Sequence, residues 1–204
     1  MQRHGSRTAL IVVDIQNDFA DPDGSLSVPG AEAVVAAANR EIARAVECGS
    51  TVVATQDWHP EHTPHFARDG GPWPVHCVGG TWGAELHPAL QLPEAAARVR
   101  KGGNGEDGYS GFTMRDPRSG ATTSTELEGI LRAAGVGAVA IVGLATDYCV
   151  KSTALDAIRL GFRTTVLTDA VAAVDLHPGD GDRALEELRT AGVELLVETA
   201  PAGS

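Results

Sequence analysis

Two hydrophobic patterns alternate along the chain. Short, nearly unbroken apolar runs predict strands that are buried on both faces, as the strands of parallel sheets are. They span residues 8–14, 51–57, 97–102, 138–143, 163–170 and 193–198. Segments with apolar residues three and four positions apart predict helices over 31–49, 123–135, 146–161 and 182–191. This alternation predicts an α/β fold, in which a mainly parallel central sheet of about six strands is flanked by helices on both faces.

The length of the chain fits one domain. With 204 residues it is long enough for one substantial core and short for two, so residues 1–204 are expected to form a single domain, with 1–7 and 198–204 flexible. The segment 58–93 shows neither pattern and is rich in Pro, Gly, His and Trp. Loops of this length inside a compact domain are usually functional, so its side chains are candidates for a site.

Composition and charge exclude several classes of function. Apolar residues make up 43% and charged residues 21%, and no apolar run is long enough to cross a membrane. The formal net charge of -11 argues against a nucleic-acid partner, which requires a basic surface. The apolar run at 9–13 is too short for a secretory signal, and the three cysteines are odd in number, without metal-ligand spacing. We therefore expect free thiols and a cytoplasmic location.

Four polar residues stand at the carboxyl ends of the predicted strands. Asp14, Asp57 and Lys101 close the first three strands, and Cys149 follows the fourth. In an open parallel sheet these ends face one crevice, where ligands bind. Cys149 is predicted to lie within about one turn of a helix start, where the helix dipole favours a thiolate. The set suits amide or ester cleavage through a covalent intermediate, although a single cysteine at such a turn can equally be a packing residue.

The long loop carries a second cluster of polar side chains. It combines one carboxylate with three imidazoles within about twenty residues, a donor set suited to zinc, iron or manganese. The residues are Asp57, His59, His65 and His76. We therefore predict one divalent metal ion at this loop. The other histidines considered, His4, His62 and His87, fit solvated positions.

A glycine-rich stretch at residues 103–108 satisfies the dinucleotide fingerprint G-x-G-x-x-G. The residues that follow show no helical periodicity, so they offer no helix terminus for a pyrophosphate. Glu106 and Asp107 would also repel phosphate groups. We therefore predict no nucleotide cofactor.

Five motifs, taken in order, resemble the nicotinamidase branch of the isochorismatase-like cysteine hydrolases. They are ALIVVDIQNDF around Asp14, TQDWHPEHTPHF with Asp57, His59 and His65, WPVHCVGGTWGAELHP with His76, KGGNGEDGYSGF with Lys101, and GLATDYCVKSTALDA with Cys149. The resemblance covers almost the whole chain and implies the isochorismatase-like hydrolase fold. It also implies hydrolysis of nicotinamide, or of a close analogue such as pyrazine carboxamide, to the acid and ammonia.

The resemblance assigns the catalytic roles. Cys149, Asp14 and Lys101 would form a triad in which the cysteine forms a thioester with the substrate. Backbone N–H groups of Ala145 and Cys149 would receive the oxyanion. The Leu144–Ala145 peptide bond would be cis, as in this family.

The resemblance also implies how the substrate is held. Apolar walls for a pyridine ring would be provided by Phe19, Trp73, Tyr109, Ala145 and Tyr148. The metal would dock the ring nitrogen and be held by Asp57, His59 and His76, with His65 as a fourth ligand. Members of the family are also expected to assemble as homo-oligomers.

Three alternatives stay open. Related amidases that act on N-carbamoyl compounds, and isochorismatase itself, do not need the Asp-x-His metal set. In a different class, a water-activating metallohydrolase would leave Cys149 inert, and removing its metal would abolish the chemistry. A non-catalytic binding protein with this fold would show no thiol-dependent hydrolysis.

Overall fold

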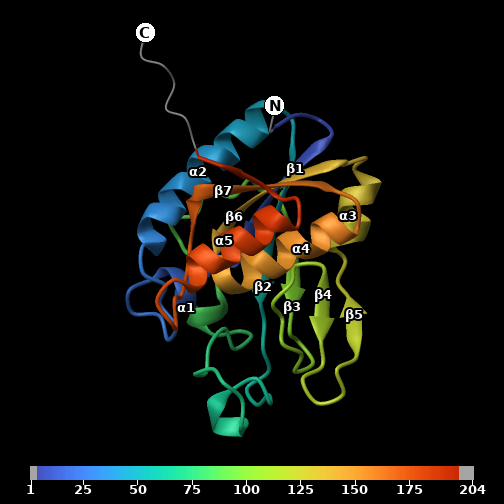
Figure 1. Cartoon of the computed structure of the whole chain (residues 1–204). Coiled ribbons are helices and arrows are strands. Elements are labelled where there is room, and N and C mark those ends of the chain that lie inside the picture. The colour runs from blue at the N-terminus through green and yellow to red at the C-terminus, as the bar shows by residue number, and fades with distance from the viewer. Residues whose placement is uncertain (1–3, 198–204) are drawn as a thin grey trace.

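A computed structural model describes residues 4–197 and places six parallel strands in one sheet, in the order β3-β2-β1-β6-β7-β8. The strands are β1 (Thr8–Val13), β2 (Thr51–Asp57), β3 (Ala97–Lys101), β6 (Ala138–Leu144), β7 (Arg163–Ala172) and β8 (Glu194–Leu196). They lie where the apolar runs predict them, so the predicted fold class is confirmed (Figure 1). The strand order reverses between β1 and β6, which is where ligands bind in sheets of this kind.

Helices cover both faces of the sheet. The side chains of each strand alternate between the two faces, and on the central strands both sets are apolar. In β1, Leu10 and Val12 join one hydrophobic cluster, and Ile11 and Val13 join the other. The first cluster includes α2 (Ala31–Glu47), and the second includes α3 (Leu127–Ala133), α4 (Lys151–Arg159) and α5 (Asp180–Thr190). The central strands are therefore apolar on both sides, and their polar ends are left for the site.

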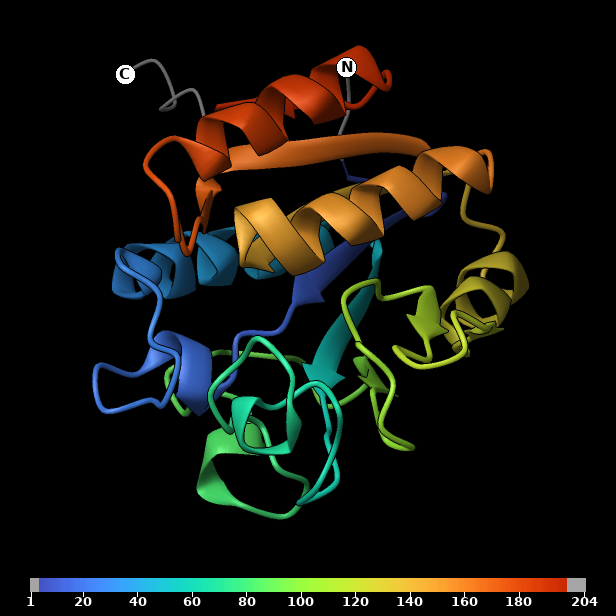
Figure 2. The same cartoon turned by 60° about the horizontal axis from the view of Figure 1, so that its bottom comes forward.

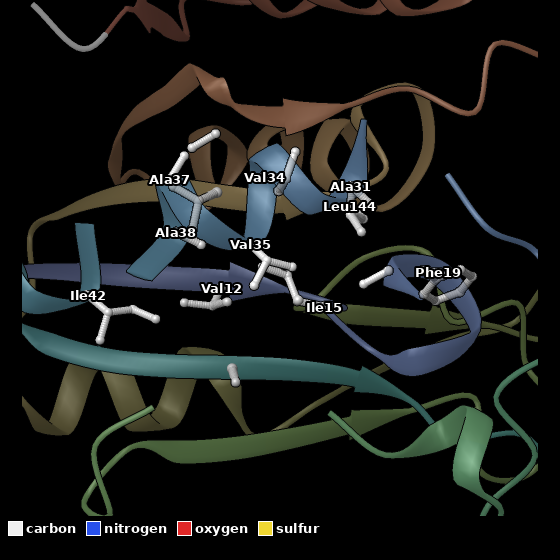
Figure 3. Packing of buried hydrophobic residues seen from close by; sticks show 14 of the residues in the cluster. Val12, Ile15, Phe19, Ala31, Val34, Val35, Ala37, Ala38, Ile42 and Leu144 are labelled. Atoms are coloured by element: carbon white, nitrogen blue, oxygen red, sulfur yellow. The ribbon is translucent and has the colours of Figure 1, made fainter. Parts of the chain in front are cut away.

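Helix α2 illustrates the packing that holds the sheet in place. Val34, Val35, Ala38 and Ile42 recur at helical spacing, are at most 5% exposed, and belong to the same hydrophobic cluster as Val12 of β1 (Figure 3). Burying a valine or isoleucine side chain contributes about 1.5–3 kcal/mol to stability. A single helix face of this kind therefore fixes the position of the strand that ends at the site.

Two predicted helices begin later than the sequence pattern suggests. Residues 123 and 124 of the segment predicted as a helix belong instead to β5 (Thr122–Ser124), which pairs antiparallel with β4 (Thr113–Arg115). Exposed β-branched threonines favour such a strand, and the Thr125 hydroxyl accepts the Leu127 N–H at the start of α3. The predicted helix over 146–161 begins with a π-helical turn, η3 (Thr146–Val150), and the regular helix α4 starts only after it.

The loops that follow the strands gather at the carboxyl edge of the sheet, below the arrowhead of β2 in Figure 2. They contain the short helix α1 (Asn17–Ala20) and the 3₁₀ turns η1 (Ala67–Asp69) and η2 (Trp82–Ala84), none of which the sequence pattern predicts. In the loop after β2, residues 58–93, the two 3₁₀ turns η1 and η2 are the longest elements. The site is therefore built from loops on a rigid sheet.

The chain ends are only partly described. Residues 1–3 and 198–204 of the segments expected to be flexible lie outside the described residues, as does the last residue of the predicted strand 193–198. His4 is buried and its Nε2 lies 2.8 Å from Glu41 Oε2, so the solvated position expected for His4 is wrong. Within residues 4–197, every helix is too short or too polar to cross a membrane.

Candidate active site and metal centre

The structure brings together the four polar residues that close the strands. Asp14 follows β1, Asp57 ends β2, Lys101 ends β3, and Cys149 lies in the turn after β6. One ligand atom each of Asp14, Asp57 and Cys149 lies within 4.8 Å of the others. Because β1, β2 and β3 are adjacent and parallel, their last residues converge at one edge.

The Lys101 ammonium lies at the centre of this cluster and is fully buried. Its Nζ donates to Asp14 Oδ2 over 2.7 Å, and it also donates to Asp57 Oδ1 and to the Gly108 carbonyl oxygen. Cys149 Sγ lies 3.8 Å from the same nitrogen. Burial alone would lower the pKa of Lys101, but the two carboxylates outweigh it and hold that pKa well above its usual range. Lys101 is therefore a fixed cation between two carboxyl groups and a thiol.

Asp14 and Cys149 are both pushed toward their neutral forms. Burial raises the pKa of Asp14, and the Lys101 ammonium offsets this only in part. Burial also raises the pKa of the Cys149 thiol, with Lys101 acting against it and Asp14 acting with it. The thiolate expected from a helix dipole is therefore wrong: the turn is π-helical and the sulfur is surrounded by buried groups. A neighbouring base has to remove the proton, and a carboxylate oxygen of Asp14 lies within 4.8 Å of Cys149 Sγ.

Asp57 behaves differently from Asp14 although both are buried. Burial would raise the pKa of Asp57, but Lys101 and the His59 side chain outweigh it and hold that pKa below its usual range. Asp57 thus stays an anion while Asp14 can exchange a proton. The Lys101 ammonium thus contacts one carboxylate that stays charged, Asp57, and one that can accept and release a proton, Asp14.

The turn before Cys149 contains the predicted cis peptide bond, between Leu144 and Ala145. The Ala145 carbonyl accepts the N–H groups of Tyr148 and Val150, each over 3.1 Å, which closes the turn around the sulfur. These bonds do not test where an oxyanion would bind. The role expected for the N–H groups of Ala145 and Cys149 stays a prediction.

Two buried side chains that position the cluster were missed by sequence reasoning. The Thr55 hydroxyl donates to Asp14 Oδ1 over 2.6 Å, so both oxygens of Asp14 are held. Gln16 Nε2 donates to the Asp57 carbonyl over 2.7 Å, and Gln16 Oε1 accepts the Asp57 N–H over 2.8 Å. Thr55 stands two residues before Asp57 on the same face of β2, which is a signal that could have identified it.

The histidines of the long loop form a buried cluster beside Asp57. One ring nitrogen each of His59, His65 and His76 lies within 4.8 Å of the others. Asp57 Oδ2 lies 3.6 Å from His59 Nε2 and 3.9 Å from His76 Nε2. The structure thus brings together all four residues of the predicted metal set.

This cluster fits a divalent cation. Burial lowers the pKa of His65 to about 3 and lowers the pKa of His76 as well, so both imidazoles are neutral and able to ligate. Both ring nitrogens of His59 are buried without a hydrogen-bond partner in the described part of the chain. Buried polar atoms are rarely left unpaired, and a metal ion would supply the missing partner.

The loop is folded so that its distant histidines meet. His59 pairs in parallel with Val78, so residues 59 and 76 are held side by side, and Phe66 pairs with Trp73 in the same way. Gly102 lies over the His59 ring with a φ of +83°, and a Cβ there would come within 2.6 Å of His59 Cε1. Glycines in the stretch 103–108 therefore belong to a loop packed on the site, and β4 rather than a helix follows it.

A small cavity joins the thiol to the histidine cluster. Its walls include all the residues predicted to bind the ring, together with Leu26 and Val174, which sequence reasoning missed. The lining consists of Phe19, Leu26, Asp57, His65, Trp73, His76, Tyr109, Ala145, Tyr148, Cys149 and Val174. Trp73 Nε1 donates to the Tyr109 hydroxyl over 2.8 Å, and the rings of Trp73 and Tyr148 meet edge to face with centroids 4.8 Å apart. The cavity is thus lined by flat side chains between a nucleophile and a candidate metal site, a lining that suits a planar ring.

The comparisons with known proteins cover almost the whole chain. Nicotinamidase of Acinetobacter baylyi is 41% identical over 211 residues, which cover 95% of this chain and 94% of that protein. The crystal structure of pyrazinamidase of Pyrococcus horikoshii in complex with zinc has a TM-score of 0.84 and 43% identity, covering 94% of this chain and 99% of that one. PnC1 from L. infantum in complex with nicotinate has a TM-score of 0.84 and 39% identity, covering 96% and 98%.

A family model described as "Isochorismatase domain" matches residues 8–199. The matched region includes both clusters of the site and the whole six-stranded sheet. The match and the identity to curated relatives agree with the fold, and the chain belongs to the isochorismatase domain family.

Proposed function

We propose that this protein is a nicotinamidase that hydrolyses nicotinamide to nicotinate and ammonia through a thioester on Cys149. One observation carries the proposal: a single cavity places the Cys149 thiol, with its Asp14 and Lys101 partners, opposite a buried histidine cluster. The relatives named nicotinamidase and pyrazinamidase, and the related structure with nicotinate, support it.

The first half of the reaction forms the thioester. Asp14 takes the proton of the Cys149 thiol, and Lys101 stabilises the resulting negative charge from 3.8 Å. The sulfur attacks the carboxamide carbon, and the carbonyl oxygen becomes an oxyanion that the N–H groups of Ala145 and Cys149 receive. Asp14 then gives its proton to the amide nitrogen, the carbon–nitrogen bond breaks, and ammonia leaves.

The second half of the reaction releases the acid. Asp14, again a carboxylate, removes a proton from a water molecule, whose oxygen attacks the thioester carbon. The carbon–sulfur bond breaks, the sulfur recovers the proton from Asp14, and nicotinic acid leaves and loses its carboxyl proton to water as nicotinate. The raised pKa of Asp14 suits it to both directions of proton transfer, because a more basic carboxylate accepts a thiol proton more readily.

Asp57, His59 and His76 would hold a divalent ion, with His65 as a fourth ligand. When bound, the ion supplies a docking point for the ring nitrogen and thereby orients the carboxamide toward the sulfur. Phe19 and Tyr148 line the cavity between the two clusters and would hold the faces of the ring. Assembly as a homo-oligomer is part of the proposal that rests on the family resemblance.

The direct test is ammonia release from nicotinamide by the purified protein. We expect turnover with nicotinamide and with pyrazine carboxamide, with nicotinate identified by mass. The control is an N-carbamoyl amino acid, which the proposal excludes as a preferred substrate. Hydrolysis of that compound in place of both ring amides would assign the chain to the related amidases instead.

Removal of the metal ion is expected to weaken binding of nicotinamide much more than it slows the chemistry. After chelation, the Michaelis constant for nicotinamide should rise about tenfold or more, a loss of about 1.4 kcal/mol per factor of ten. Benzamide, which lacks the ring nitrogen, is the matched control and its Michaelis constant should be unchanged. Adding zinc back should restore the original value.

A different result would support the water-activating alternative. In that case kcat for both amides would fall to the background rate on chelation, with binding little changed. Circular dichroism of the chelated protein should accompany the kinetics, so that unfolding is not mistaken for loss of chemistry.

A further inference from the structure

Asp18, in the short helix α1, links three segments of the site although it lies outside the cavity. It is buried, and its Oδ2 accepts the Cys77 N–H over 2.7 Å while its Oδ1 accepts the Ser25 N–H over 3.1 Å. Its carbonyl oxygen also accepts the Leu26 N–H over 3.0 Å. One residue therefore ties α1 both to the following loop and to a segment about sixty residues away.

Each linked segment carries a residue that lines the cavity. Phe19 follows Asp18 directly, Leu26 follows Ser25, and His76 precedes Cys77. The ring centroids of Phe19 and His76 are 5.5 Å apart, so a wall of the cavity and a member of the histidine cluster share a contact. The Asp18 carboxylate thus determines how the apolar wall and the metal site are placed relative to each other.

The orientation of His76 depends on the backbone that Asp18 holds. Cys77 has a left-handed backbone, with a φ of +47°, which is uncommon outside glycine. Its N–H belongs to the peptide group that joins it to His76, and this N–H is the one that Asp18 accepts. His76 Nδ1 donates to the Pro74 carbonyl over 2.8 Å, which leaves Nε2 as the nitrogen available to a metal.

The turn η2 packs closely against the Asp18 carboxylate. A Cβ on Gly83 would collide with the carboxylate, so the turn η2 approaches it closely enough to require glycine. The carboxylate is therefore a fixed anchor for the segment that follows His76.

We propose that Asp18 is a positioning residue for the metal centre, which holds the His76–Cys77 peptide so that His76 can ligate and Phe19 stays against it. The proposal rests on the proposed function, because it assumes a divalent ion among Asp57, His59, His65 and His76. It assigns Asp18 no contact with the substrate.

The test is zinc affinity, measured on the full-length protein by competition with a chromophoric chelator. Asp18→Asn keeps the size of the side chain but places an amide NH₂ against one of the two N–H donors. We expect zinc affinity to fall by about 10–100-fold, as it does when outer-shell partners of metal ligands are lost. The Michaelis constant for nicotinamide should rise at limiting zinc and recover toward the parent value at saturating zinc.

Asp147→Asn is the matched control. Asp147 is equally buried, and its two oxygens accept the Val174 and Asp175 N–H groups over 3.0 and 2.9 Å, so these bonds hold the segment after β7 and not the histidine loop. Its zinc affinity should stay within about threefold of the parent. If Asp18→Asn does not fold, Gly83→Ala displaces the carboxylate without removing its charge and should lower zinc affinity in the same direction.

The outcomes separate this proposal from the one on which it rests. A parent protein that binds no zinc would overturn the metal site itself. A parent that binds zinc, with Asp18→Asn or Gly83→Ala binding it equally tightly, would overturn the role of Asp18 alone. An equal loss in Asp18→Asn and Asp147→Asn would also overturn it, because both changes would then act through general stability.

Discussion

Replacing Cys149 with alanine is expected to lower kcat for nicotinamide by a factor on the order of 10⁴ or more, as removal of a covalent nucleophile does in other hydrolases. The change removes the atom proposed to attack the carboxamide carbon in the first half of the reaction. It leaves in place the Asp14–Lys101 ion pair and the histidine cluster. Ammonia release at saturating nicotinamide, followed beside the parent protein, measures the effect.

The control for this variant is its zinc content and its nicotinamide affinity, both of which should match those of the parent. The change deletes a single sulfur atom from the wall of the cavity and keeps the buried Cβ. Turnover by Cys149→Ala at the rate of the parent would contradict the thioester mechanism. It would instead favour the reaction of a water molecule at the metal site.

Replacing Lys101 with methionine is expected to lower the free energy of unfolding by about 3–5 kcal/mol, the usual cost of removing one partner of a buried ion pair. Methionine fills similar space but cannot neutralise Asp14 and Asp57, which are at most 3% exposed. It also leaves the Gly108 carbonyl without the donor that Lys101 provides. Urea unfolding of the two proteins, compared at the same pH and zinc concentration, measures the difference.

A matched substitution shows whether burial is the cause. Lys151 pairs with Glu187 at 3.0 Å, but both side chains are partly exposed, at 28% and 55%. Lys151→Met should therefore cost about 1 kcal/mol or less, because exposed pairs contribute little. Equal losses in the two variants would mean that the Lys101 cluster is not the buried charge network described above.

Much of the architecture could be predicted from local patterns. The β1, β2 and β6 runs are apolar enough to be buried on both faces, and the strands end at Val13, Asp57 and Leu144, each within one residue of the end predicted from its apolar run. The prediction was weaker where the pattern was polar. Thr122–Ser124 is a strand with every residue exposed, and no periodicity distinguishes such a strand from the start of a helix.

The ionisation state of Cys149 shows the limit of a local argument. A position near a helix start predicts a thiolate, and that prediction was wrong because the first turn is π-helical and the sulfur is buried beside Asp14. Burial and neighbouring charges are properties of the folded surroundings, which no nearby residue in the sequence specifies.

The sequence by itself determined which residues end the strands, because apolar runs and polar ends are local features that a parallel sheet places at one edge. Only the tertiary structure decided which of them meet. Lys101 bonds to Asp14 across 87 residues and to Asp57 across 44, and Asp18 bonds to Cys77 across 59. Contacts over such separations depend on strand order, on the pairing within the long loop and on burial, and these arise only when the whole chain is packed.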